Sequence, residues 1–476
     1  MNAATTAVAL VGGDVRPVEV QVHVGRQQEQ FKLSGLPDTA VREAKDRVRA
    51  AVVSSGLSFP NRTVTVNLAP ARLPKSGTDF DLAIALGVLA ANGDIPRPGN
   101  VIVVGELALD GSIRSVPSTL GAAVLSARTG TPCLVSATSA RSVASVPQSV
   151  VHGVESLAAA VGLLRAGVDP GAAAVPEVST VETGGEDLSE VKGQALARRA
   201  IEIAAAGGHH LLLHGPPGGG KTMLARRLSG ISPPLSDSEA VEVALIHAAA
   251  GYERGLSRNR PFRAPHHTAS RVALVGGGSG VAIPGEVSLA HRGTLFLDEM
   301  AEFPRGNLDT LRQPLEDGTV TVARRGITAT FPSAFHLVAA TNPCPCGYLG
   351  DHRRPCVCRP AEIARYRQRL SGPLLDRFDL VVKVDRLEAS ALHEPTETTR
   401  TVGERVAKAR TFLAGADHFF LPDADHMLIR ALENGLLTAR GTDRVRRVAR
   451  TIAALDGSDK VVEEHVAEAM ASRVAW

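Results

Sequence analysis

Two patterns of apolar residues alternate along the first 165 residues. Runs such as VEVQVHV, TVTVNLA and NVIVVGELAL alternate in polarity and are rich in β-branched residues, which predicts strands. The runs DTAVREAKDRVRAAVVSSG and DLAIALGVLAANG are Ala-rich and repeat at helical spacing. We therefore expect an α+β domain over residues 1–165.

A change of pattern divides the rest of the chain. Residues 166–187 are rich in Pro, Gly, Thr and Glu and lack periodicity, which predicts a linker. From residue 188 a helical run, an apolar strand, a Gly-rich turn and another helix follow, with later strands at LFLDE, TVTVARR and HLVAATN. This order predicts an α/β core with a mostly parallel sheet over residues 188–385. Residues 386–476 show helical patterns without strands, so we expect a C-terminal helical domain.

Composition places this 476-residue chain among multidomain globular proteins, with 44% apolar and 21% charged residues. No apolar run reaches the roughly 18–20 residues that a membrane span needs. The N-terminus lacks the basic segment of a signal peptide, and four of the five cysteines are clustered rather than spread as in secreted disulfide scaffolds. We expect a cytoplasmic protein.

Charge is unevenly distributed between the two halves. Residues 1–190 carry 15 Lys+Arg against 18 Asp+Glu, and residues 191–476 carry 37 against 31. The basic half could face a polyanion, although ordinary solvated arginines would give the same count. Aromatic residues make up only 3% of the chain, which argues against nucleic-acid binding mainly through base stacking.

The segment GPPGGGKT carries the strongest chemical signal. It follows an apolar strand and precedes a helix, the context in which G-x-x-x-x-G-K-[ST] forms a phosphate-binding loop. Backbone N–H groups would surround the phosphates of ATP, the lysine would contact the β- and γ-phosphates, and the threonine hydroxyl would bind Mg²⁺. The predicted nucleotide-binding residues are Gly215, Pro216, Pro217, Gly218, Gly219, Gly220, Lys221 and Thr222.

Two later strands end in residues suited to ATP hydrolysis. LFLDE places Asp298 where it could bind Mg²⁺ and Glu299 where it could act on the attacking water. HLVAATN ends in Asn342, which could hold that water from the other side. Taken singly, these are ordinary strand ends and turn residues; together with the phosphate-binding loop they predict an ATPase.

The ordered set GPPGGGKT, LFLDE, VAATN, SGPLLDRFDL and TARGTDRVRR resembles AAA+ ATPases. FRAPHHTAS, GEVSLAHRGTLFLDE and NPCPCGYLG resemble, more closely, the Mg-chelatase-like ComM/YifB family. The resemblance implies that Asn342 is sensor 1, that Arg377 is an arginine finger acting on a neighbouring subunit, and that Arg440 is sensor 2, with Arg444 as the second choice. It also implies a homo-oligomeric ring, most often a hexamer, with the C-terminal helices as a lid.

The segment LEDGTVTVARRGITATFPSAF predicts a hairpin with a basic tip at Arg324 and Arg325. Its placement resembles the pore hairpin of related ring helicases, so we expect salt-sensitive contacts with single-stranded or branched DNA; an ordinary exposed hairpin is the alternative. Residues 262–286 resemble a second pore element. For His266 and His267 within it, a structural or pore role is favoured over metal binding.

The function expected is an ATP-driven DNA translocase or branch-migration helicase in recombination or natural transformation. Remodelling of a protein partner by a Mg-chelatase-like ATPase is the alternative.

The N-terminal region resembles the proteolytic domain of Lon-type proteases, in VNLAPARLPKSGTDFDLAIALGVLAANG and VIVVGELALDGSIRSVP. That chemistry needs a serine nucleophile and a lysine base. Asp79 stands at the position matching the serine, and Leu120 or a neighbour at that of the lysine. We expect a domain without the catalytic dyad that serves as a scaffold for the ring or for DNA.

Two Cys-x-Cys pairs flank a short basic loop in TNPCPCGYLGDHRRPCVC. Their four thiolates could bind one structural Zn²⁺, although Cys-x-Cys is shorter than the usual Cys-x₂-Cys spacing. His352 would be a spare ligand, and free or redox-active thiols are the alternative. The four candidate ligands are Cys344, Cys346, Cys356 and Cys358. Because Asn342 lies two residues before the first cysteine, we expect this loop to brace the ATPase site.

Overall fold

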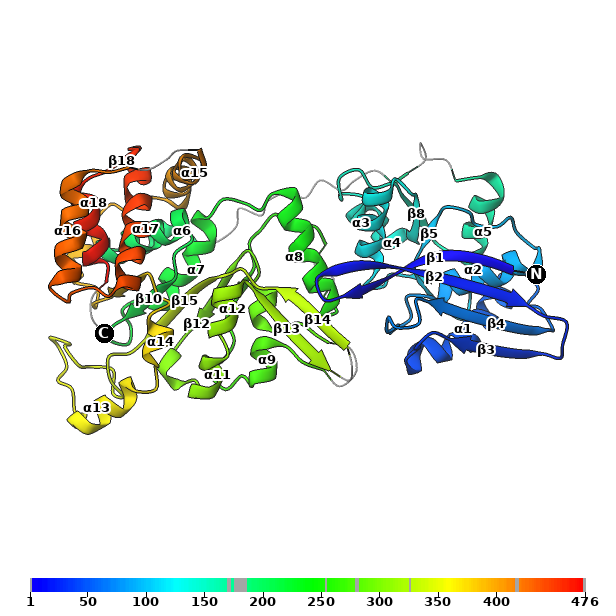
Figure 1. Cartoon of the computed structure of the whole chain (residues 1–476), viewed down its shortest axis with the longest axis horizontal. Coiled ribbons are helices and arrows are strands. Elements are labelled where there is room, and N and C mark those ends of the chain that lie inside the picture. Colours follow the sequence, from blue (N-terminus) through cyan, green and yellow to red (C-terminus); the bar gives the residue numbers. More distant parts are fainter. Residues whose placement is uncertain are drawn as a thin grey trace.

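A computed structural model describes residues 2–168, 173–174, 186–252, 255–278, 282–324, 327–415 and 419–473, with only the backbone at Arg324 and Ile327. Three regions follow one another along the long axis of the molecule (Figure 1). The N-terminal domain lies at one end, the C-terminal helices at the other, and the α/β core lies between them.

A seven-stranded sheet with the order β3-β4-β2-β1-β5-β8-β9 forms the N-terminal domain. Strands β1 and β2 form a long antiparallel hairpin, and β5, β8 and β9 continue the sheet in parallel. In β2 every second residue from Val18 to Val24 is buried, as its alternating sequence predicts. The strands are β1 (Asn2–Val11), β2 (Asp14–Val24), β3 (Gln30–Ser34), β4 (Thr63–Ala69), β5 (Ile102–Val103), β8 (Cys133–Ser136) and β9 (Val151–Val154), beside the separate pair β6 (Glu106–Leu107) and β7 (Ile113–Arg114).

Helices complete this domain. The α2 sequence is apolar on all sides, and the helix is buried along almost its whole length in the main core, whereas α1 buries one face. The helices are α1 (Thr39–Ser54), α2 (Asp81–Asn92), α3 (Thr119–Thr129), α4 (Ala137–Val143) and α5 (Leu157–Ala166). The predicted α+β class is confirmed.

The central region contains a five-stranded sheet, β11-β12-β15-β10-β16, whose described pairings are all parallel. Its middle strands are buried on both faces. Leu211 and Leu213 pack with α7 (Lys221–Ile231), the helix after the Gly-rich turn, and with the C-terminal helices. Leu212 packs on the opposite face of the sheet. The strands are β10 (Leu211–His214), β11 (Phe262–Arg263), β12 (Thr294–Leu297), β15 (His336–Thr341) and β16 (Leu380–Lys383). The predicted α/β core with a parallel sheet is confirmed.

Helices and short turns surround this sheet. The main ones are α6 (Ala195–Gly207), α7 (Lys221–Ile231) and α8 (Asp237–Ala249). The shorter ones are η2 (Leu188–Glu190), α9 (Arg271–Val275), α10 (Glu286–Leu289), η3 (Met300–Glu302), α11 (Arg305–Asp309), α12 (Arg312–Asp317), α13 (Pro360–Arg367), α14 (Gly372–Leu375) and η4 (Ala389–His393).

The predicted hairpin is present as β13 (Thr319–Arg324) and β14 (Ile327–Pro332), which pair with each other apart from the five-stranded sheet. It lies on the side of the core that faces the N-terminal domain (Figure 1). The turn of the β1–β2 hairpin touches it, since the backbone N–H of Gly13 donates to the carbonyl oxygen of Thr330 at 3.2 Å. Ala244 and Leu245 of α8 join an apolar cluster of the N-terminal domain. The two regions are therefore in direct contact.

The C-terminal region consists of α15 (Thr399–Gly415), α16 (Pro422–Glu433), α17 (Ala439–Leu455) and α18 (Glu463–Ala471). The expectation that strands are absent here was wrong in one detail, because β17 (Phe419–Phe420) and β18 (Lys460–Val461) form a short parallel pair. Val445, Val448 and Ile452 of α17 share one apolar core with α6, α7 and the sheet. Among the residues described, no helix combines the length and apolar character that crossing a membrane requires.

Candidate functional site

The phosphate-binding loop connects β10 to α7 at the carboxyl end of the parallel sheet. Gly215 has no room for a side chain, because a Cβ there would lie 2.0 Å from the carbonyl oxygen of Val384. Gly220 has φ +88°, a left-handed conformation that favours glycine, immediately before α7 begins at Lys221. The loop thus aims the first turn of α7 at the space above the sheet, where an anion would meet unpaired N–H groups.

Lys221 is buried at the centre of this site. Its ammonium group donates to the carbonyl oxygens of Gly215 at 2.7 Å and Pro216 at 3.0 Å, and to Oδ1 of Asn342 at 3.2 Å. Burial lowers the pKa of Lys221 to about 8, and the nearby carboxylates of Asp298 and Glu299 oppose that shift. The lysine and the end of strand β15, predicted separately, are therefore brought together.

The predicted Mg²⁺ ligands also meet. The hydroxyl of Thr222 donates to Oδ2 of Asp298 at 2.7 Å, so α7 and the end of β12 present two adjacent oxygen ligands. Oxygen donors of this kind are what Mg²⁺ prefers, together with the phosphate oxygens of a nucleotide. These residues fit a Mg²⁺–ATP complex.

Glu299 projects from the same edge. Its φ is +49°, a costly conformation for a residue with a side chain, and its carboxylate is about half exposed at 54%. The backbone N–H of Glu299 donates to Oδ1 of Asp298 at 2.9 Å, which fixes the two carboxylates relative to each other. Glu299 is thus available to a water molecule while Asp298 faces Thr222.

His267 is a contact of this site that the sequence reasoning missed. Its Nδ1 lies 3.4 Å from Oε2 of Glu299, and its ring lies 4.1 Å from that of His266. The sequence offers no carboxylate next to these histidines in the chain, yet the fold brings Glu299, two residues after the end of β12, beside His267. The available signal was the order of strands, since His267 follows β11, which lies next to β12 in the sheet.

The predicted arginines lie elsewhere. Arg377 comes before β16, which runs parallel to β10, so it lies at the opposite end of the sheet from the phosphate-binding loop, and its guanidinium pairs with Glu316. Burial and then the charges of Arg440 and Arg312 lower the pKa of Arg377, so Arg377 and Arg440 are close enough for their charges to interact.

Burial distinguishes the two candidates for sensor 2. Arg440 is exposed near the start of α17. Arg444 is buried with its Nε 3.9 Å from Oδ1 of Asp379, beside Arg447 on the same carboxylate at 2.8 Å. Arg444 is therefore held beside a carboxylate of its own chain, and Arg440 stays the first choice for sensor 2, with Arg444 as the second.

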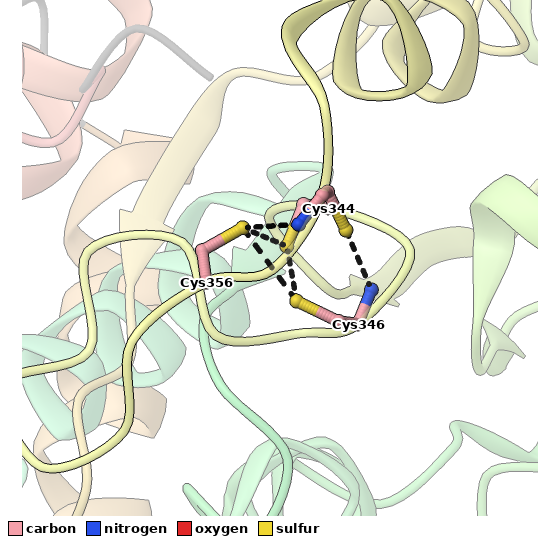
Figure 2. A group of neighbouring side chains, drawn as sticks. Cys344, Cys346 and Cys356 are labelled. Atoms are coloured by element: carbon pink, nitrogen blue, oxygen red, sulfur yellow. Dashed lines mark hydrogen bonds between the residues drawn. The ribbon is translucent and has the colours of Figure 1, made fainter.

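The four clustered cysteines come together between β15 and α13 (Figure 2). Sγ of Cys344 lies 3.4 Å from Sγ of Cys346 and 3.6 Å from Sγ of Cys356, and all four sulfurs, that of Cys358 included, lie within 4.8 Å of one another. Four thiolates at the usual Zn–S distance lie about 3.8 Å apart in a tetrahedron. The geometry fits one Zn²⁺, and His352 is not part of the group.

This loop packs against the phosphate-binding loop. A Cβ on Gly347 would lie 2.8 Å from Cδ of Pro217 and 3.8 Å from the side chain of Asn342. Further along the loop, Arg354 stacks over Tyr348 at 4.2 Å and Arg386 pairs with Asp351 at 2.8 Å. The cysteine cluster is therefore part of the wall of the nucleotide site.

The position predicted to contact DNA is described only in part. Arg324 ends β13, opposite Ile327, and Arg325 lies outside the described residues. Residues 262–286, expected to form a second pore element, contain β11, the short helix α9 and a bridge between Gly277 and Ile283.

The position matching the Lon-type serine is closed. Asp79 accepts a hydrogen bond from the backbone N–H of Ser118 at 3.2 Å, and burial raises the pKa of Asp79 to about 6. Leu120 is part of an apolar cluster. Lys75 is buried and donates to the carbonyl oxygens of Leu68 at 2.8 Å and Pro70 at 2.5 Å. These residues hold the domain together through internal contacts.

Comparison with protein families matches three models of the magnesium chelatase ChlI subunit in chain order. Residues 18–139 match "Subunit ChlI of Mg-chelatase", residues 187–392 match "Magnesium chelatase, subunit ChlI", and residues 416–473 match its C-terminal model.

YifB of Escherichia coli and the competence protein ComM of Haemophilus influenzae are each 40% identical to this chain, over 98% of it and 96% of the relative. The chain belongs to the ComM/YifB family of Mg-chelatase-like proteins. This membership supports the AAA+ core and suggests ATPase activity and a role in competence or recombination. A shorter match, 25% identical over 39% of this chain and 25% of the relative, is to the DNA replication licensing factor Mcm6 of Drosophila melanogaster.

Proposed function

We propose that this chain hydrolyses ATP as the subunit of a ring-shaped motor that translocates on DNA. The observation that carries the ATPase part is the convergence of Lys221, Thr222 and Asp298 at one edge of the parallel sheet, with Glu299 exposed beside them. These are the groups that binding and in-line attack on a γ-phosphate require.

The chain's own residues divide the work. Lys221 and the N–H groups that open α7 would bind phosphate oxygens; Thr222 and Asp298 would hold Mg²⁺, which would supply positive charge to the phosphates. Glu299 orients and deprotonates the attacking water, and Asn342 lies on its other side. The imidazole of His267, whose Nδ1 lies 3.4 Å from Oε2 of Glu299, holds the Glu299 carboxylate in place until the attacking water takes over the contact made by His267.

Arg377 and Arg440 serve the nucleotide of a neighbouring subunit in this proposal. Arg377 lies at the opposite end of the sheet from the phosphate-binding loop, and the charge of Arg440 acts on it; this placement favours a site completed by a second copy. A guanidinium delivered there would neutralise charge that develops on the γ-phosphate. Contacts of this head-to-tail kind close into a ring.

DNA is the proposed substrate of the motor. The support is the β13–β14 hairpin with arginines at positions 324 and 325, the basic balance of residues 191–476, and the names of the relatives ComM and Mcm6, which refer to competence and to DNA replication. Backbone phosphate contacts would make binding independent of sequence and sensitive to salt.

The test is ATPase activity with and without a synthetic four-way DNA junction, at roughly 50 mM and 200 mM salt. We expect stimulation at low salt that is lost at high salt and lost in R324A/R325A. The control R400A/K408A removes two positive charges from α15 and should keep the stimulation.

The family models also favour a second candidate, an ATPase that remodels a protein partner in the manner of a chelatase subunit. An ATPase activity indifferent to DNA at both salt concentrations would overturn the DNA motor and favour this candidate.

A further inference from the structure

Glu316 connects the β13–β14 hairpin to the predicted arginine finger. It lies on α12, which ends at Asp317, two residues before β13 begins. Its carboxylate pairs with the guanidinium of Arg377. The side chain of Arg377 is 15% exposed and that of Glu316 is 56% exposed, so the pair lies at the edge of the protein with the arginine on the inner side.

Arg377 is surrounded by positive charge, so its pair with Glu316 is important for its neutralisation. The guanidinium has Arg312 and Arg440 as charged neighbours, and its Nε is buried without a hydrogen-bond partner among the described residues. Glu316 therefore supplies the negative charge that compensates Arg377 inside its own chain. To reach a phosphate on another subunit, Arg377 must leave Glu316.

A second set of contacts ties the same two segments together. Ser371 precedes α14, the short helix that leads to Arg377. The Nη2 of Arg312 donates to the hydroxyl of Ser371 at 2.9 Å, and that hydroxyl donates to Oδ1 of Asp309 at 3.2 Å. The α11–α12 segment and the segment that carries Arg377 are thus joined at two places, of which only the Glu316 pair holds the guanidinium itself.

The hairpin is joined to α12 at both of its ends. Gly318 alone separates Asp317 from β13, and the backbone N–H of Ser333, just after β14, donates to the carbonyl oxygen of Gly318 at 2.7 Å. A displacement of the hairpin base is therefore transmitted to the end of α12, where Glu316 lies.

We propose that Glu316 is a positioning residue that holds Arg377 in a resting position, and that movement of the hairpin on DNA withdraws Glu316 and frees Arg377 for the neighbouring nucleotide. The part concerning DNA rests on the proposed function. The resting pair rests on the proposed role of Arg377 in ATP hydrolysis but not on DNA, because it predicts a change in ATP hydrolysis without DNA.

The test compares E316Q with D317N, which removes the same charge one residue further along α12. Steady-state ATPase activity of the full chain is measured with and without the four-way junction. We expect E316Q to raise kcat without DNA roughly tenfold at unchanged KM, since a neutral amide no longer competes for the guanidinium. The further stimulation by DNA should shrink accordingly, and D317N should behave as the unsubstituted protein.

The double variant E316Q/R377A locates the effect. If Glu316 acts through Arg377, the double variant is no more active than R377A alone. E316D, which keeps the charge on a shorter side chain, should give a kcat between those of the unsubstituted protein and E316Q. If E316Q lowers the melting temperature, E316D is used in its place.

An unchanged or lowered kcat without DNA in well-folded E316Q would overturn the proposal, as would an E316Q/R377A variant more active than R377A. These outcomes differ from failure of the proposed function, which would appear in the unsubstituted protein as ATP hydrolysis that DNA does not stimulate.

Discussion

Two buried lysines, one in the N-terminal domain and one in the α/β core, share one kind of hydrogen-bond partner, two main-chain carbonyl oxygens each. Lys75 donates to the carbonyl oxygens of Leu68 and Pro70, and Lys221 to those of Gly215 and Pro216. Burial lowers the pKa of both. The two lysines differ in the other groups that surround them.

Around Lys221 the ends of β12 and β15 bring carboxylates and an amide, and the first turn of α7 opens toward solvent. Around Lys75 the described partners are main-chain oxygens, and in the same domain the carboxylate of Asp79 is held by the backbone of Ser118. The same buried ammonium is thus suited to phosphate in one region and to structural support in the other.

Loss of Lys221 should have the largest effect. K221A removes the cation that meets the β- and γ-phosphates, and we expect ATP turnover to fall by about a hundredfold or more. K75M should leave turnover unchanged. Equal losses in the two variants would contradict the division of roles.

Glu299 and Asp79 give the next contrast. E299Q should lower kcat by about a hundredfold, because the general base is lost, while ATP binding measured by fluorescence of a labelled nucleotide persists. D79N is the matched control in the N-terminal domain and should hydrolyse ATP normally. Turnover retained by E299Q would exclude it as the base.

Removal of the proposed zinc should weaken nucleotide binding. Metal analysis is expected to find one zinc per chain, and C356S/C358S should lose it. Because the loop packs through Gly347 on Pro217, we expect ATP affinity to fall by roughly tenfold, about 1.4 kcal/mol. C133S, at a buried cysteine of the N-terminal domain, is the control. Less than one zinc per chain in protein never exposed to a chelator would count against the site.

The lowered pKa of Lys221, about 8, predicts a pH dependence of ATP binding. Below pH 8 the Lys221 side chain is mostly protonated before ATP binds. Above pH 8 the neutral amine must take up a proton when ATP binds, so the affinity for ATP falls as pH rises. Between pH 7 and 8.5 the expected loss is about fourfold. K221R, whose guanidinium stays protonated over this range, should show no such slope. An affinity that rises with pH would contradict the assignment.

The smallest effect concerns Lys75. K75M keeps the side-chain volume but removes the ammonium donor from the carbonyl oxygens of Leu68 and Pro70, the second of which keeps its bond from the backbone N–H of Leu73. The loss should cost about 1–3 kcal/mol of N-terminal domain stability. Urea unfolding followed by circular dichroism measures this. Unchanged unfolding would show that the buried ammonium is dispensable.

The sequence predicted the parts of the molecule whose signal is local. The alternation of VEVQVHV, the apolar run LLLHG and the Gly-rich turn each specify an element through their own residues, and the motif order placed Lys221, Thr222 and Asp298. The two-residue strands β17 and β18 went unpredicted, because a pair this short depends on tertiary packing of the helices around it.

Contacts between distant segments were also beyond the sequence. The pairs His267–Glu299 and Glu316–Arg377 join residues 32 and 61 positions apart, and nothing in either segment alone selects its partner. The cysteines show the intermediate case, since their clustering was visible but their packing on Pro217 was not.

The central claim is that the hydrolysis site is shared between two copies of the chain, and mixing two inactive variants tests it most directly. K221A keeps Arg377, and R377A keeps Lys221, so each variant alone should be nearly inactive. In an equimolar mixture, allowed to exchange subunits, roughly a quarter of head-to-tail interfaces would combine an intact Lys221 with an intact Arg377 from the neighbour. We predict ATPase activity in the mixture approaching that share of the unsubstituted protein. A mixture as inactive as its components, with rings shown to have exchanged, would contradict the account.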